Sequence, residues 1–329
     1  MKFFGYKKNL FKNGISFKKP DKSFEISDNF DTSDLINQQK ENIQPNESPD
    51  RAALYNKIID YYSNNPSDDY KKELTFFKNN GQIQVFPYAK VKSMPPVKAE
   101  YDFEKRMPYI LHKEHKKLYF PKSWGVEQAV ARYSKYIESE NLLGGDYSEK
   151  SPHQYLSDKI FVKKNDIVFD VGSAEALFAL EVIDLAKKMI IIEEDEMWVE
   201  PLKATFEPYR EKVTIINKRL SNVDTHDQVT LESTLENEEL GGLFIKMDIE
   251  GYEVNAIREN EILLKKNIDL RAVCCTYHGQ NDAEALRLLF TDFGYETEFS
   301  NGYMLFVYDS QIQPPFFRKG VIRAKKVNG

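Results

Sequence analysis

The sequence predicts an α/β fold whose main domain is a doubly wound, mostly parallel sheet that ends in an antiparallel hairpin. Two observations support this prediction. From residue 160 onward, short apolar and β-branched runs alternate with helix-like stretches, which is typical of parallel strands buried on both faces. Near the end of this region, residues 295–301 and 302–309 form two strand-like runs around Asn301-Gly302, a dipeptide that favours tight hairpin turns.

Five strand-like runs lead the repeating units of this domain, at 167–171, 189–193, 213–216, 243–249 and 272–277. Helix-like runs follow four of them, at 176–188, 198–209, 252–266 and 282–294. This alternation indicates βαβ units, and open sheets of that kind bind ligands beyond the carboxyl ends of their strands. Candidate functional residues are therefore sought at those ends.

The rest of the chain divides by composition. Residues 1–50 are predicted to form a flexible N-terminal tether, because their polar stretch has too few large apolar residues to offset the entropy of ordering. Residues 51–150 are expected to hold a helical hairpin and a small β/α extension. The main domain is assigned to 151–310, and residues 311–329 are expected to be a basic C-terminal tail.

Within the extension, residues 82–88 and 107–121 are predicted to be strands, the second being a hairpin that turns near His115. His112 and His115 have the spacing of a metal-binding pair. With no cysteine or further histidine close by, a solvated surface position is favoured over a metal site for both.

Composition limits the classes of function. The chain has 329 residues with 46 Lys+Arg and 52 Asp+Glu, a net charge of -6, which argues against wholesale nucleic-acid binding. Its two cysteines, Cys274 and Cys275, are adjacent and point to opposite faces if they lie on a strand, so a disulfide between them is not expected. No uncharged apolar run approaches the roughly 20 residues of a membrane span. We expect a cytoplasmic protein with no membrane span.

The turn after the first strand of the main domain runs from Asp170 through Gly172 and Ser173 to Ala176. A glycine directly after a buried strand allows a ligand to approach the backbone closely. A dinucleotide site would need further glycines to accommodate a pyrophosphate, and alanines stand there instead. Glu193 follows about 20 residues later, the spacing at which a carboxylate binds ribose hydroxyls. The pattern indicates S-adenosylmethionine as the cofactor rather than NAD.

The fourth strand carries the most informative residues. Lys246, Asp248 and Glu250 alternate with apolar residues, so a strand places the three charges on one face. Buried charges are costly unless they are paired or functional. We predict that they face the ligand crevice, while a structural pair between Lys246 and a carboxylate is the alternative. The fifth strand ends at His278, whose side chain can exchange a proton near neutral pH.

Several of these segments together resemble the FkbM-type S-adenosylmethionine-dependent methyltransferases over about residues 151–308. The most specific string is K-x-D-I-E-G-x-E, from Lys246 to Glu253, beside the glycine turn and the histidine at the end of the fifth strand. The resemblance implies a class I methyltransferase-like sheet and O-methylation of a hydroxyl of a sugar, polysaccharide or related metabolite. In this sequence Ala176 stands where relatives often have glycine, which could narrow the cofactor pocket.

The resemblance also implies site residues. Asp170, Gly172 and Ser173 would form the cofactor turn, and Glu193 would bind the ribose. Ser221 and Asn222 would lie near the adenine, and Asp248 beside the methyl group. Separately from the resemblance, His153 stands just before the first strand, and this position is expected to border the methionine end of the cofactor.

For the mechanism, we expect His278 or Asp248 to accept the proton of the acceptor hydroxyl, with Lys246 and Glu250 orienting the acceptor or each other. In a variant of this hypothesis Asp248, Glu250 and His278 hold Mg²⁺, which would acidify the hydroxyl. The sequence does not establish which applies.

Other functions stay open. The main alternative is a non-catalytic adenosine-binding or scaffold protein with the same fold. A nucleic-acid methyltransferase would need a basic groove with stacking aromatic residues, and the short basic run at 316–326 is weak support. A small-molecule or glycan substrate is therefore expected. The methyl acceptor and the oligomeric state are not determined by the sequence.

Overall fold

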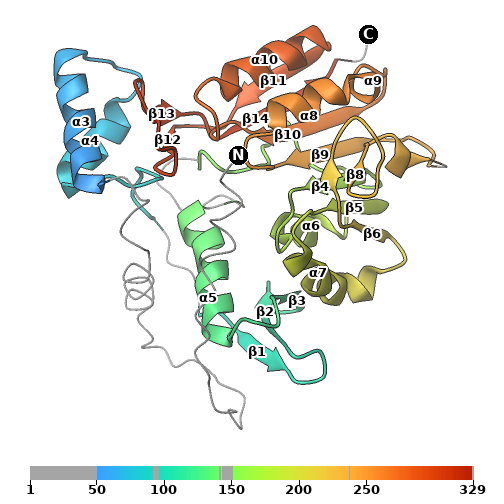
Figure 1. The fold of residues 1–329 in the computed structure, drawn as a ribbon. Coiled ribbons are helices and arrows are strands. Elements are labelled where there is room, and N and C mark those ends of the chain that lie inside the picture. Colours follow the sequence, from blue (N-terminus) through green and yellow to red (C-terminus); the bar gives the residue numbers. More distant parts are fainter. Residues whose placement is uncertain (1–49, 92–95, 141, 143–150, 237, 328–329) are drawn as a thin grey trace.

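The computed structural model describes residues 50–91, 96–140, 142, 151–236 and 238–327. Its centre is a seven-stranded sheet in the order β11-β14-β10-β9-β4-β5-β6 (Figure 1). Strands β6, β5, β4, β9 and β10 run parallel to one another, and β14 is antiparallel to both β10 and β11. The doubly wound sheet with a terminal antiparallel pair is therefore confirmed.

The helices of the described residues are α3 (Arg51–Asn64), α4 (Lys71–Asn80), α5 (Val126–Ser134), α6 (Leu177–Val182), α7 (Val199–Phe206), α8 (Glu253–Glu259), α9 (Glu261–Leu264) and α10 (Asp282–Asp292), and a π-helix, η1, spans Lys135–Glu140. The strands of the large sheet are β4 (Ile167–Val171), β5 (Lys188–Ile192), β6 (Val213–Ile216), β9 (Leu243–Met247), β10 (Leu270–Cys275), β11 (Tyr295–Phe299) and β14 (Val321–Lys326). Smaller sheets contain β1 (Ala99–Asp102), β2 (Met107–His112) and β3 (Lys116–Tyr119), then β7 (Arg219–Leu220) with β8 (Gln228–Val229), and β12 (Met304–Leu305) with β13 (Phe317–Arg318).

Helices cover both faces of the large sheet. Val168, Phe244 and Cys275 pack in one apolar cluster with residues of α6 and α7. Their neighbours Phe169 and Cys274 lie in a second cluster with residues of α8, α9 and α10. Successive strand residues point to opposite faces, so the continuous apolar runs in the sequence fill both layers. Figure 1 shows α8 and α10 on one side of the sheet and α6 and α7 on the other.

The predicted hairpin around Asn301-Gly302 is wrong. Strand β11 pairs with β14, while the short β12 pairs with β13. The apolar residues Leu305 and Val307, which the prediction placed in the hairpin, are buried instead against α3 and α4. Tertiary burial outweighs the local turn signal here.

The expected basic C-terminal tail is also corrected in its described part. Residues 321–326 form β14, which lies inside the sheet between β10 and β11. Val321, Ile322 and Ala324 are fully buried there. The guanidinium of Arg323 donates to the carbonyl oxygens of Tyr155 and Gln154, so its charge is satisfied within the fold. A solvated tail was predicted because the sequence does not show these partners.

The N-terminal extension follows the prediction in part. The helical hairpin is present as α3 and α4, with the side chain of Asp50 accepting the N–H groups of Ala52 and Ala53. The β2–β3 hairpin is present too, but residues 82–88 do not form a strand. The predicted tether, except for its last residue, lies outside the described residues.

His112 is not on the surface as predicted. It is buried, and its ring nitrogens contact the hydroxyl of Tyr133 at 2.7 Å and a carboxylate oxygen of Glu181 at 2.9 Å. His115 is exposed. The two histidines therefore form no metal pair, because the first is engaged with α6 in the interior.

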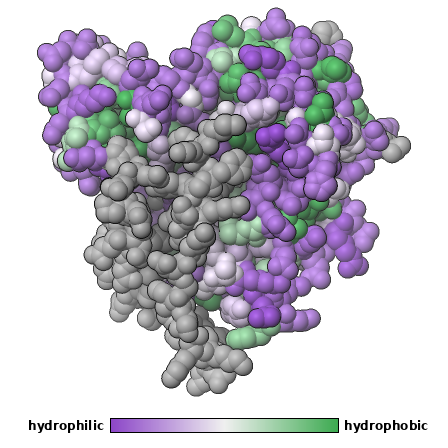
Figure 2. Space-filling model, viewed as in Figure 1, coloured by the Kyte–Doolittle hydropathy of each residue, from purple (hydrophilic) through white to green (hydrophobic). Residues whose placement is uncertain are grey.

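The face in Figure 2 is mostly hydrophilic, and its hydrophobic residues form small separate groups outside the grey atoms. Within the described residues, no helix combines the length and the apolar composition that crossing a bilayer requires.

Candidate functional site

The carboxyl ends of β4 and β9 touch. Gly172, directly after β4, has a left-handed φ of 68°, and a Cβ atom there would lie 1.9 Å from the backbone oxygen of Asp248. The backbone N–H of Asp248 in turn donates to the oxygen of Val171 at 3.1 Å. A glycine is therefore required by both the backbone conformation and the close approach of the two loops.

Lys246 lies beneath this contact. It is the register partner of Asp170 on the adjacent strand, and its ammonium lies 3.0 Å from a carboxylate oxygen of Asp170. The ammonium also donates to the oxygen of Gly172 at 2.9 Å, while Asp170 accepts the N–H of Ala179 at the start of α6. Burial lowers the pKa of Lys246, but the nearby carboxylates of Asp170 and Asp248 outweigh it, and the net shift is upward. Lys246 is thus a buried cation that joins β9, β4 and the turn after β4.

The turn after β4, residues 172–176, which we call the glycine turn, has an unusual backbone. Ala174 and Ala176 also have left-handed φ angles, of 46° and 59°. Such angles are unfavourable for residues with a Cβ atom. Glu193, at the end of β5, holds the turn: one carboxylate oxygen accepts the N–H of Ala174 at 2.7 Å, and the other accepts the N–H of Asp195 at 2.9 Å. Glu193 is itself buried and joins the glycine turn to the loop after β5, while its predicted contact with a ribose stays a prediction.

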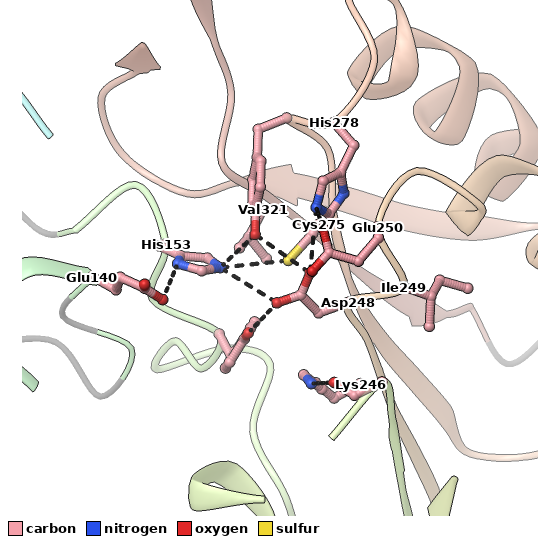
Figure 3. A network of polar contacts seen from close by, with 12 residues as sticks. Glu140, His153, Lys246, Asp248, Ile249, Glu250, Cys275, His278 and Val321 are labelled. Carbon is pink, nitrogen blue, oxygen red and sulfur yellow. Dashed lines mark hydrogen bonds and ion pairs between the residues drawn. The ribbon is translucent and has the colours of Figure 1, made fainter. Parts of the chain in front are cut away.

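Asp248 is the centre of a polar cluster (Figure 3). Its carboxylate accepts hydrogen bonds from the hydroxyls of Tyr155, at 3.2 Å, and Tyr277, at 3.3 Å. The Nε2 atoms of His278 and His153 lie 3.7 and 3.9 Å from its oxygens. We call these five residues the Asp248 cluster. The Asp248 side chain is 22% exposed, whereas the side chains of His153 and His278 are 3% and 7% exposed, so Asp248 is the member that an outside ligand reaches most easily.

His278 is surrounded by carboxylates. Its Nδ1 lies 3.1 Å from Glu253, and its Nε2 lies 3.7 Å from both Glu250 and Asp248. Burial lowers its pKa, but Glu253 and then Asp248 and Glu250 raise it, with a net value of about 9. His278 is therefore an imidazolium at neutral pH.

Glu253 is fully buried and also accepts the backbone N–H groups of Ile249 and Gly251, which fixes the loop after β9. Glu250, in contrast, has a left-handed φ of 56° and a side chain that is 62% exposed. Glu253 was not predicted to be a site residue, although its place in the first turn of a helix was visible in the sequence.

His153 joins the cluster from the segment before β4. Figure 3 shows its ring between Glu140 and Asp248, with Nδ1 3.8 Å from the carboxylate of Glu140. Nε2 also contacts the Sγ atom of Cys275 at 3.5 Å and the hydroxyl of Tyr277 at 3.4 Å. Burial lowers the pKa of His153, so its imidazole is neutral near pH 7. The structure thus places His153 beside Asp248, and sequence reasoning missed its other neighbours.

Ser221 and Asn222 follow β7. The hydroxyl of Ser221 contacts the side-chain oxygen of Asn222 at 3.4 Å, and the backbone N–H of Ser221 donates to Val229. Asn217 contacts the residue after β5: its side-chain amide donates to the backbone oxygen of Glu193 at 2.8 Å.

Two hollows of the described residues lie away from the glycine turn. One is lined by residues from 154–159 and 298–301 with Arg323, and the other by residues from 187–188 and 210–214 with Glu238. Neither includes the glycine turn or Glu193.

Comparisons with known proteins give structural matches only. No family model and no curated protein matches the chain. The precorrin-6y C5,15-methyltransferase of Geobacter metallireducens is 15% identical over 51% of this chain and 83% of its own, with a TM-score of 0.34. A Streptococcus mutans protein in complex with SAH is 13% identical over 51% of this chain and 92% of its own, with a TM-score of 0.34. An rRNA methylase from Streptococcus thermophilus is 12% identical over 50% of this chain and 89% of its own, with a TM-score of 0.33.

The resemblance to the FkbM-type methyltransferases stays a prediction. The strand order is more informative. Numbered along the chain, the strands of the large sheet are arranged 3-2-1-4-5-7-6 with the seventh antiparallel, which is the class I methyltransferase sheet. The fold class is thereby confirmed.

Proposed function

We propose that this chain is an S-adenosylmethionine-dependent O-methyltransferase whose acceptor is a hydroxyl group of a sugar, a polysaccharide or a related metabolite. One observation carries the proposal. The glycine turn, the acid that follows β5 and Asp248 at the end of β9 meet at the carboxyl ends of a class I sheet. Because a fold alone does not determine a function, the proposal depends on these side chains.

Residues of the glycine turn suit an adenosine cofactor. The hydroxyl of Ser173 and one carboxylate oxygen of Glu175 are buried without a hydrogen-bond partner among the described atoms, and buried polar atoms of this kind call for a ligand or a water. Each oxygen of Glu193 accepts one N–H group, and a carboxylate oxygen has two lone pairs, so ribose hydroxyls can still donate to it. We assign the cofactor to these residues, with Asp170 and Gly172 supporting the turn.

The cofactor supplies an electrophilic methyl group when it is bound. The chain must then orient the acceptor hydroxyl and accept its proton. Asp248 is the best-placed proton acceptor, because its carboxylate is partly exposed and is held in one orientation by Tyr155 and Tyr277. Burial and then the charge of Asp248 raise the pKa of both tyrosines, so both hydroxyls stay protonated and remain donors.

His278 suits a different role. As an imidazolium held between Glu253 and Asp248 it has no free lone pair for a proton near neutral pH. Of the two proton acceptors that the sequence suggested, we therefore favour Asp248. Glu250 is exposed beside it and is placed to orient an acceptor, whereas Lys246 acts from beneath the turn as a positioning residue.

Mg²⁺ bound to Asp248, Glu250 and His278 is not favoured. Magnesium requires near-octahedral oxygen ligands, and the histidine nitrogens here face carboxylates. No step of the proposed reaction is assigned to this ion.

Calorimetric titration of the full chain with S-adenosylmethionine, together with mass spectrometry of the purified protein, tests the cofactor assignment. We expect one molecule to bind per chain. Glu193→Gln should weaken binding by about tenfold or more, since a hydrogen bond to a charged group contributes about 1.5–3 kcal/mol. Glu194→Gln, at the exposed neighbouring position, is the matched control and should bind as the unchanged chain does.

The second candidate is a non-catalytic adenosine-binding or scaffold protein. The N–H groups of Ala174 and Asp195 that Glu193 accepts would also serve a purely structural role, and this is the observation behind the second candidate. If neither S-adenosylmethionine nor its demethylated product binds or co-purifies, the enzyme assignment is wrong and a scaffold role is the better account.

The acceptor class needs its own experiment. Transfer of a labelled methyl group to sugars and oligosaccharides is expected, and transfer to RNA is not, because the chain has a net charge of -6. Label found in RNA but not in the carbohydrate fraction would overturn the acceptor class while leaving the methyltransferase assignment intact.

A further inference from the structure

Three different metal-binding side chains converge beside the candidate site. One ligand atom each from His153, Asp248 and Cys275 lies within 4.8 Å of the other two. They come from the segment before β4, the end of β9 and the end of β10, so only the folded sheet brings them together. Figure 3 shows the sulfur of Cys275 and the carboxylate of Asp248 on the same side of the His153 ring.

The spacing is close to that of a tetrahedral metal site. The Nε2 atom of His153 is 3.5 Å from the sulfur of Cys275 and 3.9 Å from an oxygen of Asp248. Bonds of about 2.0–2.3 Å to zinc at near-tetrahedral angles place the ligand atoms about 3.3–3.6 Å apart. The third separation, from the sulfur of Cys275 to the carboxylate of Asp248, is within 4.8 Å, so an inward shift of Asp248 by roughly 1 Å would complete this geometry.

The surroundings of the histidine match a metal ligand. A histidine that binds a metal through one nitrogen usually directs the other at a carboxylate, which fixes the ring and its tautomer. Nδ1 of His153 faces Glu140 at 3.8 Å and has no hydrogen-bond partner among the described atoms. The hydroxyl of Tyr155 in turn supports the oxygen of Asp248 that faces His153.

We propose that His153, Asp248 and Cys275 bind a divalent transition-metal ion of the zinc type, with a fourth position left for an outside ligand. Sulfur and imidazole donors select such ions over magnesium or calcium. Three protein ligands are typical of catalytic rather than structural zinc. The site stands whether or not the chain transfers methyl groups. If it does, the ion would acidify an acceptor hydroxyl at its fourth position, and the other oxygen of Asp248, which Tyr277 orients, would accept the proton.

The two adjacent cysteines provide a matched experiment. Cys275 faces the Asp248 cluster, whereas Cys274 packs on the opposite face of the sheet with residues of α8 and α10. The full chain, first stripped with a chelator and without cofactor, is titrated with Co²⁺ and followed by absorption. We expect one ion per chain, with visible bands of tetrahedral cobalt and a near-ultraviolet band from thiolate to cobalt, all displaced by Zn²⁺.

Cys275→Ser should abolish the thiolate band and weaken Co²⁺ binding by about tenfold or more, and His153→Gln should weaken it similarly. Cys274→Ser should retain both the band and the affinity. Circular dichroism and thermal unfolding of each metal-free variant identify any variant that fails to fold, and an intact His153→Gln then substitutes for a misfolded Cys275→Ser.

The proposal is overturned if the unchanged chain shows no thiolate band, which would leave only a thiol–imidazole hydrogen bond. It is also overturned if the band survives in folded Cys275→Ser or disappears in folded Cys274→Ser. None of these measurements requires S-adenosylmethionine. A failure of the proposed metal site can therefore be distinguished from a failure of the methyltransferase assignment.

Discussion

Asp170 and Lys246 are direct neighbours on adjacent parallel strands and form a buried ion pair with a nitrogen–oxygen distance of 3.0 Å. Neither side chain is more than 5% exposed. The pair also holds the oxygen of Gly172 and the first turn of α6. The acid assigned to the cofactor turn and the lysine assigned to the acceptor are therefore one structural unit beneath the site.

Lys246→Met should lower the free energy of unfolding by about 3–5 kcal/mol, because it leaves the carboxylate of Asp170 buried without its partner. Urea unfolding followed by circular dichroism measures this change. The matched control is Lys122→Met, which removes an exposed pair with Glu200 and should cost less than about 1 kcal/mol. Equal losses in the two variants would show that the buried pair does not hold the turn.

The fold was predictable where both faces of a strand are apolar. The runs that became β4, β5 and β10 have almost no polar residues, so burial on both sides follows from composition. Strand β14 was missed because its lysines and Arg323 resemble a solvated segment. The carbonyl oxygens that accept from Arg323 come from residues more than 160 positions earlier, which no local pattern shows.

The candidate site was predictable to the level of its strand ends. The sequence placed Asp248 and His278 at the ends of neighbouring strands, and the structure has their side chains 3.7 Å apart. The pairing of Lys246 with Asp170 depends on the register between β4 and β9, and the contact of His153 with Cys275 joins residues 122 positions apart. Both relationships require the folded sheet, so periodicity alone could not supply them.

Replacing each of the two left-handed alanines of the glycine turn with glycine should change the stability of the chain by different amounts. A left-handed conformation costs an alanine about 1–2 kcal/mol, while glycine loses about 0.4–1 kcal/mol through its freer unfolded state. Ala174→Gly should therefore stabilise the chain by about 0.5–1 kcal/mol. Ala176→Gly should be close to neutral, since its methyl group is buried and its removal costs about 0.8 kcal/mol more.

Thermal and urea unfolding of the two variants measure this difference. A substantial loss of stability in Ala174→Gly would contradict the left-handed backbone at that position. Binding of S-adenosylmethionine to Ala176→Gly then shows whether the alanine methyl narrows the cofactor pocket.

The ionisation of Glu181 should make the free energy of unfolding depend on pH in the acidic range. It contacts the buried His112 at 2.9 Å and the ammonium of Lys113, and these hydrogen bonds lower its pKa from 4.5 to about 2. A carboxyl group whose pKa is lower in the folded chain stabilises the fold above its unfolded pKa, and this contribution is lost as the pH falls from about 4.5 towards 2. Glu181→Gln should therefore be less stable than the unchanged chain at pH 6, with the difference shrinking towards pH 3. Urea unfolding across this range measures the difference, and a constant difference would exclude the proposed pairing.

Asp248→Asn should abolish methyl transfer while leaving the affinity for S-adenosylmethionine within a few-fold of its original value. The amide keeps the shape of the side chain and can still accept one hydroxyl hydrogen bond, but it cannot take a proton from the acceptor, and loss of a general base costs about 10²–10⁴-fold in rate. The turnover number with the acceptor found by methyl labelling, measured beside calorimetric cofactor binding, separates the two effects. Asp292→Asn, at the exposed end of α10, is the control and should keep full turnover. If Asp248→Asn retains turnover with cofactor bound, another group accepts the proton, and the proposed role of the Asp248 cluster is wrong.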